Sequence, residues 1–230
     1  MLAVLVSGGE ISSPELFSPL FREADFLVAV DSGYHLFQVA GVKPNLLVGD
    51  LDSISPEMLA HAREAAVDLI TFPTEKDYTD TELAIKQAVD NGCSTILVVA
   101  PFGDRIDHTL ANVLLLTSPK FRNYDLRLLN EFQEVRLIKG SISIRSHPGE
   151  VISLLPLSDV VEGITTAGLY YRLQDANMIR GPALGISNVA TSEIVSVSVV
   201  SGDLLLVRIF QNGLDPGEYI RNELGCKSLD

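Results

Sequence analysis

Carboxylates gather in the middle of this sequence. Residues 50–107 hold 12 of the 30 acidic residues and four of the 17 basic ones, a local balance of −8 within a formal net charge of −13. Asp50 and Asp52 stand two positions apart in the segment GDLDS, and both carboxylates can reach one hard cation if the loop curls. Carboxylate oxygens are ligands that Mg²⁺ prefers in proteins. The spacing therefore predicts a divalent-cation site at this loop.

Three further polar stretches have compositions suited to a phosphorylated ligand. Lys76–Asp80 (KDYTD) leads into a predicted helix, whose free N–H groups and dipole favour an anion. Gly103–His108 (GDRIDH) places a guanidinium, which suits bidentate phosphate contact, beside carboxylates. Asp31–Gly33 (DSG) adds another carboxylate in a turn. Oxygen ligands for Mg²⁺ and fixed cations for polyphosphate are together typical of phosphoryl transfer.

Each stretch also has a purely structural interpretation. Aspartate beside glycine is common in turns, so Asp31 could serve only the backbone, and Asp52 could simply end a loop. Thr79 and Asp80 suit the start of any helix, and His108 could be a hydrogen-bonded residue at another helix start. A solvated acidic face would, however, be expected on helix exteriors and not at four successive strand ends. We therefore favour the chemical interpretation.

Residues 1–130 alternate short apolar runs with helical patterns, which is typical of βα units and a mostly parallel sheet. Strands are expected at Leu2–Val6, Phe26–Val30, Leu46–Val48, Val67–Phe72, Thr95–Ala100 and Leu126–Leu129. The four polar stretches lie where predicted strands end, and open parallel sheets bind their ligands at that edge. The predicted fold would thus bring the four stretches together.

Capping residues mark the expected helix starts. Two serines each precede a proline, whose missing N–H costs nothing in the first turn of a helix, and one threonine stands three positions before Glu82 in capping-box spacing. These starts are Ser13, Ser55 and Thr79, and a fourth helix should run from Asp107 to about Leu116.

After about residue 132 the helical period disappears, and short β-rich runs separated by glycine and proline turns predict an antiparallel sandwich. The expected strands are Glu134–Ile138, Ser141–Ile144, Val151–Leu155, Glu193–Val200 and Leu204–Ile209. We therefore expect an α/β unit over residues 1–132 and a β-sandwich over residues 133–230. The residues from Gln211 onward show no clear pattern.

Composition argues against several classes of protein. A net charge of −13 opposes binding to nucleic acid or anionic membrane, because both need an excess of Lys and Arg. The apolar start Met1–Val6 is too short for a signal peptide, and no run approaches the ~18 apolar residues of a membrane span. Cys93 and Cys226 lie too far apart for a metal knuckle, and a reducing cytoplasm is the simplest interpretation. The sequence contains no P-loop, complete dinucleotide fingerprint or G-x-S-x-G motif.

Taken together, the polar stretches resemble those of the thiamine pyrophosphokinase family. The matching segments are AVDSGYHL, PNLLVGDLDSI, KDYTDTELAI and FGDRIDHTLANV, followed by SLLPLS, GITTAGLYYRL and GISN. They occur in order from about Val4 to Phe210. Two positions depart from the family pattern, because Asp104 stands where a second glycine is common and Val189 stands where glutamate usually follows Ser-Asn.

This resemblance implies an N-terminal Rossmann-like α/β domain for nucleotide and metal, and a C-terminal β-sandwich for thiamine binding and dimerisation. It implies a homodimer with active sites between subunits. It also implies an enzyme with Mg²⁺ as its cofactor and ATP as its co-substrate. This enzyme would transfer the β,γ-pyrophosphoryl group of ATP to the hydroxyl of thiamine. The products would be thiamine diphosphate and AMP.

The resemblance further assigns roles to single residues. Carboxylates for Mg²⁺ and pyrophosphate would be Asp50, Asp52, Asp77 and Asp80, with Asp50, Asp52 and Asp80 as the metal ligands. Residues near ATP would be Asp31, Lys76, Thr79, Gly103, Arg105 and His108. Arg105 would offset transition-state charge, Asp107 would be a further active-site carboxylate, and Asp77 or Asp107 could accept the hydroxyl proton. Ser187 and Asn188 would lie by thiamine.

Three alternatives remain open at this point. A pyrophosphokinase of the same architecture could act on another hydroxymethyl heterocycle, such as a pterin. A catalytically silent nucleotide- or thiamine-binding module would keep the fold, and a metal-dependent phosphohydrolase would keep the carboxylates. Tyr170 and Tyr171 are candidates for stacking on thiamine, although strand residues of this type more often serve the core or the surface.

Overall fold

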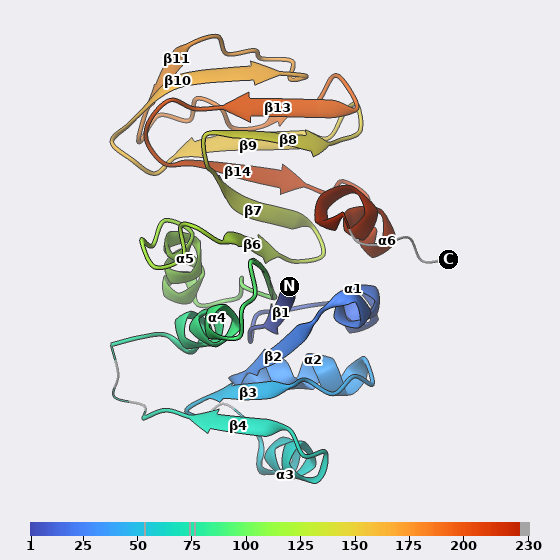
Figure 1. Ribbon diagram of the computed structural model, residues 1–230. Helices are drawn as coiled ribbons and strands as arrows, with labels where there is room; N and C mark the ends of the chain where they lie inside the picture. The colour runs from blue at the N-terminus through green and yellow to red at the C-terminus, as the bar shows by residue number, and fades with distance from the viewer. Residues whose placement is uncertain (53, 74, 76, 226–230) are drawn as a thin grey trace. The chain divides into compact units, whose positions relative to one another are not determined.

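The computed structural model describes residues 1–52, 54–73, 75 and 77–225 (Figure 1). Lys76, one of the expected ATP contacts, and Cys226 lie outside these residues. The chain forms two compact units, Met1–Glu131 and Phe132–Asp230. Among the described residues, no helix combines the length and apolar character that a membrane crossing requires.

The first unit contains a sheet whose strand pairs are all parallel. Its strands are β1 (Leu2–Val6), β2 (Phe26–Val30), β3 (Leu46–Gly49), β4 (Asp68–Thr71), β5 (Thr95–Val99) and β6 (Asp125–Leu129). They lie in the order β6-β5-β1-β2-β3-β4. The chain starts in the middle and extends to both sides, so a crevice is expected at the carboxyl ends of the central strands, where the order reverses.

Helices flank the strands of this sheet. They are α1 (Ser18–Glu23), which follows a 3₁₀ turn at Pro14–Phe17, α2 (Tyr34–Val39), α3 (Pro56–Glu64), α4 (Asp80–Asp90) and α5 (Ile106–Leu115). The predicted caps of two helices are confirmed, because Ser55 Oγ accepts from Met58 N and Thr79 Oγ1 accepts from Glu82 N, each at 3.2 Å. Helix α4 packs against β1, β2 and β3, and α5 lies beside α4 (Figure 1).

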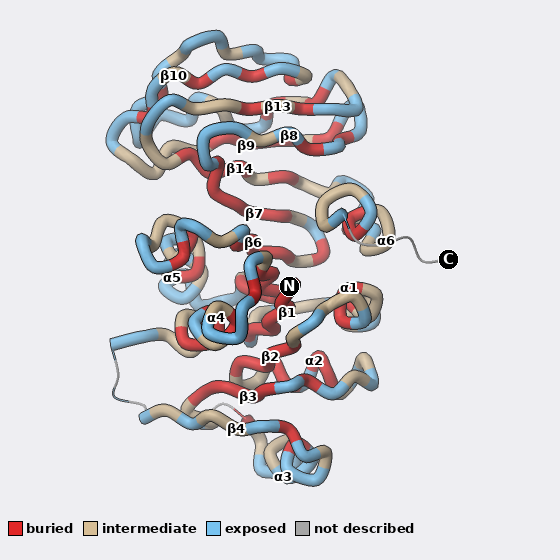
Figure 2. The backbone as a smooth tube through the Cα atoms, viewed as in Figure 1, coloured by how far each residue is buried: buried red, intermediate tan, exposed pale blue. Residues whose placement is uncertain are grey.

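The central strands owe their position to uninterrupted apolar sequence. Every residue of β1 is buried, and in β2 every residue after the half-buried Phe26 is buried (Figure 2). In β5, likewise, only the first residue is half-buried. Strands covered on both faces carry continuous Val, Ile and Leu runs because neither face meets water. The predicted mostly parallel α/β class is confirmed.

The second unit is a β-sandwich of two antiparallel sheets, as predicted. One sheet has the order β12-β9-β14-β7 and the other β11-β10-β13-β8. The strands are β7 (Gln133–Ile138), β8 (Ser141–Arg145), β9 (Val151–Pro156), β10 (Val160–Ala167), β11 (Ala176–Ile179), β12 (Asn188–Val189), β13 (Ile194–Ser198) and β14 (Leu204–Ile209). Buried residues of both sheets, among them Ile152, Leu206, Ile164 and Val195, form one core cluster.

Three strands of the sandwich, β10, β11 and β12, were not predicted. In β10 the pairing register shifts between Val161 and Ile164, and Gly163 between them has a φ of 63°. A bulge of this kind breaks the two-residue alternation by which a strand is recognised in sequence. The other two strands have four and two residues, too short for a periodic signal.

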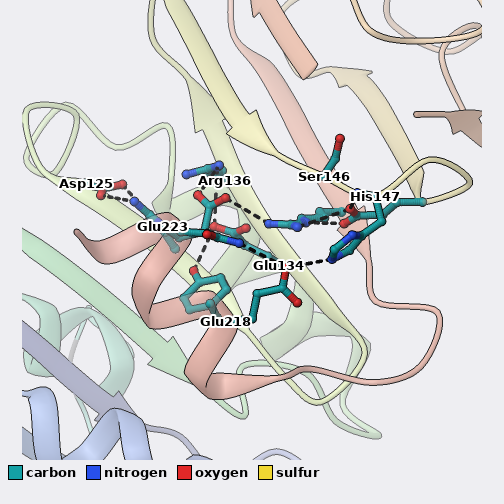
Figure 3. A network of polar contacts seen from close by, with 12 residues as sticks. Asp125, Glu134, Arg136, Ser146, His147, Glu218 and Glu223 are labelled. Atoms are coloured by element: carbon teal, nitrogen blue, oxygen red, sulfur yellow. Dashed lines mark hydrogen bonds and ion pairs between the residues drawn. The ribbon is translucent and has the colours of Figure 1, made fainter. Parts of the chain in front are cut away.

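A buried network of charges holds the C-terminal helical segment, α6 (Pro216–Tyr219) with the π-helical turn Ile220–Leu224, to β7 and β14 (Figure 3). The Glu223 carboxylate accepts from Arg136 Nη2 and from Arg208 Nη1, each at 3.0 Å. Arg208 also pairs with Glu150, and Tyr219 OH donates to Glu134 Oε1 at 3.0 Å. Buried charges are tolerated only when they are paired in this way. The last segment is therefore fixed by ion pairs, which its sequence did not suggest.

We expect Glu223→Gln to lower the free energy of unfolding by about 1–3 kcal/mol, because it weakens charge-assisted hydrogen bonds to two buried guanidinium groups. Urea unfolding measures this loss. The matched control is Asp159→Asn, which breaks the exposed pair of Asp159 with Arg180. Exposed pairs contribute little, so the control should unfold near the wild-type midpoint. Equal effects of the two substitutions would contradict the role given to Glu223.

Candidate active site

Three carboxylates from separate segments meet at the carboxyl ends of the central strands. Asp31, Asp50 and Asp80 each offer an oxygen, and these oxygens lie within 4.8 Å of one another. Asp31 follows β2, Asp50 follows β3, and Asp80 is the first residue of α4. All three side chains are half-buried. The parallel sheet thus brings together two of the three expected metal ligands, and adds Asp31, which we had expected near ATP.

The approach of Asp31 depends on the glycine that ends β3. Asp31 has a φ of 45°, and its Oδ1 accepts from Leu51 N at 3.1 Å. A Cβ atom at Gly49 would lie 1.6 Å from Asp31 Oδ1. Only glycine therefore leaves room for the Asp31 carboxylate beside the neighbouring strand.

The loop after β3 curls, as the spacing of its two carboxylates required. Leu51 has a φ of 65°, and Asp50 Oδ1 accepts from Asp52 N at 3.1 Å. Asp52 is exposed and is not one of the three clustered carboxylates. It nevertheless lies close enough for its charge to act on Asp31. Of the two carboxylates expected to share a cation, Asp50 therefore belongs to the cluster and Asp52 lies at its edge.

Asp80 reaches the cluster from the first turn of α4. The preceding Thr79 caps this helix, which directs the free N–H groups of the first turn to the same edge of the sheet. The following Thr81 is buried, and its Oγ1 lies 3.0 Å from Ser7 Oγ. Asp77 is exposed in the loop before the helix. Thr79, the expected phosphate contact, and Asp80, an expected metal ligand, are therefore neighbours at the start of α4.

Crowding of negative charge perturbs the central carboxylate. Burial, together with the charges of Asp80, Asp50 and Asp52, raises the pKa of Asp31 to about 7, and the Leu51 N–H opposes this shift. A hard divalent cation would relieve the repulsion, because carboxylate oxygens are its preferred ligands. The donor set, the spacing of the oxygens and the charge all fit Mg²⁺.

Arg105 and Asp107 form a second polar group at the start of α5. Arg105 Nε and Nη2 donate to Asp107 Oδ1 and Oδ2 at 3.1 and 2.5 Å. The guanidinium lowers the pKa of Asp107 to about 2, and the carboxylate raises the pKa of Arg105. Gly103 N donates to Thr109 Oγ1 at 3.4 Å, and His108 is exposed in the first helical turn. Arg105 is therefore a fixed cation held in an exposed bidentate pair.

In the second unit, both polar atoms of the Asn188 side chain make hydrogen bonds. Its Oδ1 accepts from Tyr171 N and Val189 N, each at 2.9 Å, and its Nδ2 donates to Tyr171 O at 2.7 Å. The neighbouring Ser187 is exposed, with a φ of 56°. Asn188 thus fixes the backbone that carries two exposed tyrosine rings, Tyr170 and Tyr171, which meet edge to face at 5.0 Å.

Sequence reasoning missed the residues that position the carboxylates. A glycine at a strand end signals a close approach, so Gly49 carried a usable signal. Ser7 and Thr81 are 74 positions apart, and nothing in the sequence pairs them. Asp31 was recognised as a site residue, but its contact with Asp50 and Asp80 depends on side-chain direction, which sequence does not reveal.

We expect Asp31→Asn to stabilise the metal-free protein at pH 8 and to have a smaller effect at pH 5. The folded state binds the Asp31 proton more tightly than the unfolded state does, so folding stability falls as the pH rises from the ordinary pKa of 3.8 to about 7 and is level above it. Asparagine tolerates the positive φ and removes the charge. Allowing for solvent screening of this half-buried group, the gain should be about 1 kcal/mol in urea unfolding with a chelator. A loss of stability at pH 8 would contradict the predicted repulsion.

Comparisons with known proteins find relatives along most of the chain. The thiamine pyrophosphokinase of Bacillus subtilis is 29% identical over 206 residues, which cover 89% of this chain and 96% of that protein. The crystal structure of the Bacillus subtilis thiamine pyrophosphokinase matches with a TM-score of 0.82 at 27% identity, covering 92% of this chain and all of the other. A thiamin pyrophosphokinase family protein from Enterococcus faecalis matches with a TM-score of 0.81, the same identity and the same coverage.

Two family models divide the chain between them. One, described as the catalytic domain of thiamin pyrophosphokinase, matches residues 17–128 and includes all three clustered carboxylates. The other, described as the vitamin B1 binding domain of thiamin pyrophosphokinase, matches residues 140–204 and includes Asn188 and the Tyr171 backbone to which it bonds. The resemblance drawn from the sequence motifs is confirmed, and the chain belongs to the thiamine pyrophosphokinase family.

Proposed function

We propose that the chain catalyses the Mg²⁺-dependent reaction of ATP with thiamine that yields thiamine diphosphate and AMP. The observation that carries this proposal is the convergence of Asp31, Asp50 and Asp80 at the carboxyl edge of the sheet. Residues 1–132 would bind the nucleotide and metal, and residues 133–230 would bind thiamine. The matches of a catalytic and a vitamin B1 binding family model to these two parts support the division.

In this proposal, Asp31, Asp50 and Asp80 hold the magnesium ion, and Asp52 contributes from the edge of the cluster. Bound Mg²⁺ would neutralise polyphosphate oxygens and orient them for displacement. The high pKa of Asp31 makes metal binding compete with a proton. We therefore expect the site to load more readily above pH 7 than below it.

The remaining residues act on the polyphosphate and the hydroxyl. Thr79 Oγ1 uses a lone pair to cap α4, which leaves its O–H free to donate to a phosphate oxygen. The Arg105 guanidinium, already charged and bound on one side by Asp107, offsets charge that develops as the thiamine hydroxyl attacks the β-phosphorus and AMP leaves. Gly103 and His108 flank this cation in the same loop.

The two candidate proton acceptors differ in their surroundings. The pair with Arg105 lowers the pKa of Asp107 to about 2, which makes this carboxylate a poor base. Asp77 is exposed in the loop before α4, and no guanidinium of the described residues pairs with it. We therefore assign any acceptance of the hydroxyl proton to Asp77. The role of Asp107 is to pair with Arg105 and balance its charge.

Thiamine is a suitable acceptor for an acidic site because its thiazolium ring is a cation. The excess carboxylates of residues 50–107 would favour it over neutral heterocycles. A pterin substrate, a silent binding module and a phosphohydrolase are not favoured, because both matching family models and the Bacillus subtilis relative and crystal structure are named for thiamine pyrophosphokinase.

We expect Asp80→Asn to lower the rate of AMP formation from ATP, thiamine and Mg²⁺ by about 100-fold or more, since even outer-shell changes at metal sites cost 10–100-fold. The matched control is Asp90→Asn, at the other end of the same helix, where Asp90 is exposed and paired with Lys86. The control should retain wild-type activity. Near wild-type activity of Asp80→Asn would sink the assignment, and a wild-type protein that releases phosphate without thiamine would point to a phosphohydrolase.

We further propose a homodimer whose active sites lie between subunits, in the cytoplasm. Several large apolar side chains of the second unit are exposed, including Val160 (43%), Ile179 (64%), Ile194 (60%) and Val200 (80%), which is typical of a surface that is covered in an assembly.

The proposed location in the cytoplasm is supported by Cys93, whose buried thiol is free and therefore suits a reducing compartment.

Subunit complementation tests the dimer. Asp80→Asn in one chain and Asn188→Ala in the other should each be inactive alone, whereas co-expression should restore about a quarter of wild-type activity. Half of the dimers are then mixed, and each mixed dimer keeps one intact site if a site draws on both subunits. Activity that stays at the level of the separate variants, or a molar mass near 24.9 kDa by light scattering, would contradict the proposal.

A further inference from the structure

We infer that the buried hydroxyl pair of Ser7 and Thr81 positions Asp80 for metal binding. The inference rests on the proposed magnesium site and adds two residues to it. Ser7 directly follows β1, and Thr81 directly follows Asp80 in α4. Their hydroxyl oxygens lie 3.0 Å apart, and the two residues are 6% and 8% exposed.

Ser7 is a rigid anchor for this contact. Its backbone N donates to Val99 O at 2.9 Å, which extends the pairing of β1 with β5. The two glycines that follow are wedged between neighbouring loops. A Cβ at Gly8 would lie 2.5 Å from Ser32 Oγ, and a Cβ at Gly9 would lie 2.2 Å from Phe102 O. The Ser7 turn therefore contacts the loop that carries Asp31 and, through Thr81, the helix that carries Asp80.

The first turn of α4 divides three tasks among three consecutive side chains. Successive helical residues point about 100° apart, so they face different surroundings. Thr79 caps the helix, Asp80 joins the carboxylate cluster, and Thr81 points to the sheet. The Thr79 cap bonds to an N–H of the same helix, whereas the Thr81 hydroxyl joins the start of the helix to Ser7, directly after β1.

Apolar packing alone would define this position less sharply. The buried face of α4 consists of Leu83, Ala84, Ile85 and Ala88 besides Thr81. Hydrophobic contacts are non-directional, and small residues permit sliding, while a hydrogen bond restricts both distance and angle. The hydroxyl pair therefore adds a directional restraint between the sheet and the residue next to Asp80.

The pair is also an unusual choice if only stability matters. A buried hydroxyl needs a hydrogen-bond partner, and a hydrogen bond between two neutral groups contributes little net stability. Valine has nearly the shape of threonine and would fill the same space without a polar group. A role in positioning explains why the hydroxyl at residue 81 is more useful than a methyl group.

The test compares Thr81→Val with Thr81→Ser by isothermal titration of Mg²⁺ into the full-length protein. We expect Thr81→Val to bind Mg²⁺ about tenfold more weakly, as is typical when outer-shell partners of a metal site are removed. Thr81→Ser keeps the hydroxyl and should bind close to wild type. In assays of AMP formation, excess Mg²⁺ should recover most of the activity of Thr81→Val, because the ligands themselves remain.

Thr166→Val is the matched control. Thr166 is 6% exposed in the sandwich, and its Oγ1 accepts from Leu173 N at 2.8 Å. This substitution also removes one buried hydroxyl contact, but it should leave the Mg²⁺ affinity unchanged. Ser7→Ala removes the pair from the other side and should weaken Mg²⁺ binding as Thr81→Val does, which keeps the test valid if one variant fails to fold.

The outcomes separate the inference from the proposed function. Wild-type Mg²⁺ affinity in folded Thr81→Val or Ser7→Ala would overturn the positioning role and leave the magnesium site standing. Equal weakening by Thr166→Val would show a general effect of lost stability and would also overturn it. A wild-type protein that does not bind Mg²⁺ would overturn the proposed site and, with it, the inference.

Discussion

Repulsion among three half-buried carboxylates is the constraint around which the first unit is built. Asp31, Asp50 and Asp80 place oxygens within 4.8 Å of one another, and burial together with this crowding raises the pKa of Asp31 to about 7. A fold chosen for stability alone would separate them. The cluster persists because the surroundings hold each carboxylate from a different side, and a bound cation would turn the repulsion into attraction.

The parallel sheet supplies these restraints with few specialised residues. Strand β1 lies between β2 and β5, so the loops that follow the central strands share one edge. Gly49 leaves space for the Asp31 carboxylate, and the buried Ser7 and Thr81 join the sheet to the start of α4. The same helix start presents free N–H groups where phosphate oxygens are expected. The clustered carboxylates and the N–H groups of the helix start are therefore positioned by one set of contacts, as the proposed metal and phosphate binding requires.

Much of this arrangement could be predicted from sequence, because the relevant signals are local. Continuous apolar runs identified β1, β2 and β5, and the Ser55 and Thr79 caps marked their helices. Signals failed where long-range contacts decide the structure. The bulge at Gly163 concealed β10, and Glu223 joins its network partly through Arg136, 87 positions away in the chain. For Asn188, the motif indicated importance, but only the structure shows its amide holding the Tyr171 backbone.

The central claim is that the three clustered carboxylates form the metal site. A crystal structure of the protein with Mn²⁺ in place of Mg²⁺ tests it directly, because manganese is located by its anomalous scattering. The account predicts an anomalous peak within about 2.3 Å of oxygens from Asp31, Asp50 and Asp80. A protein that binds Mn²⁺ and supports AMP formation with it, yet shows its peaks away from all three carboxylates, would contradict the account.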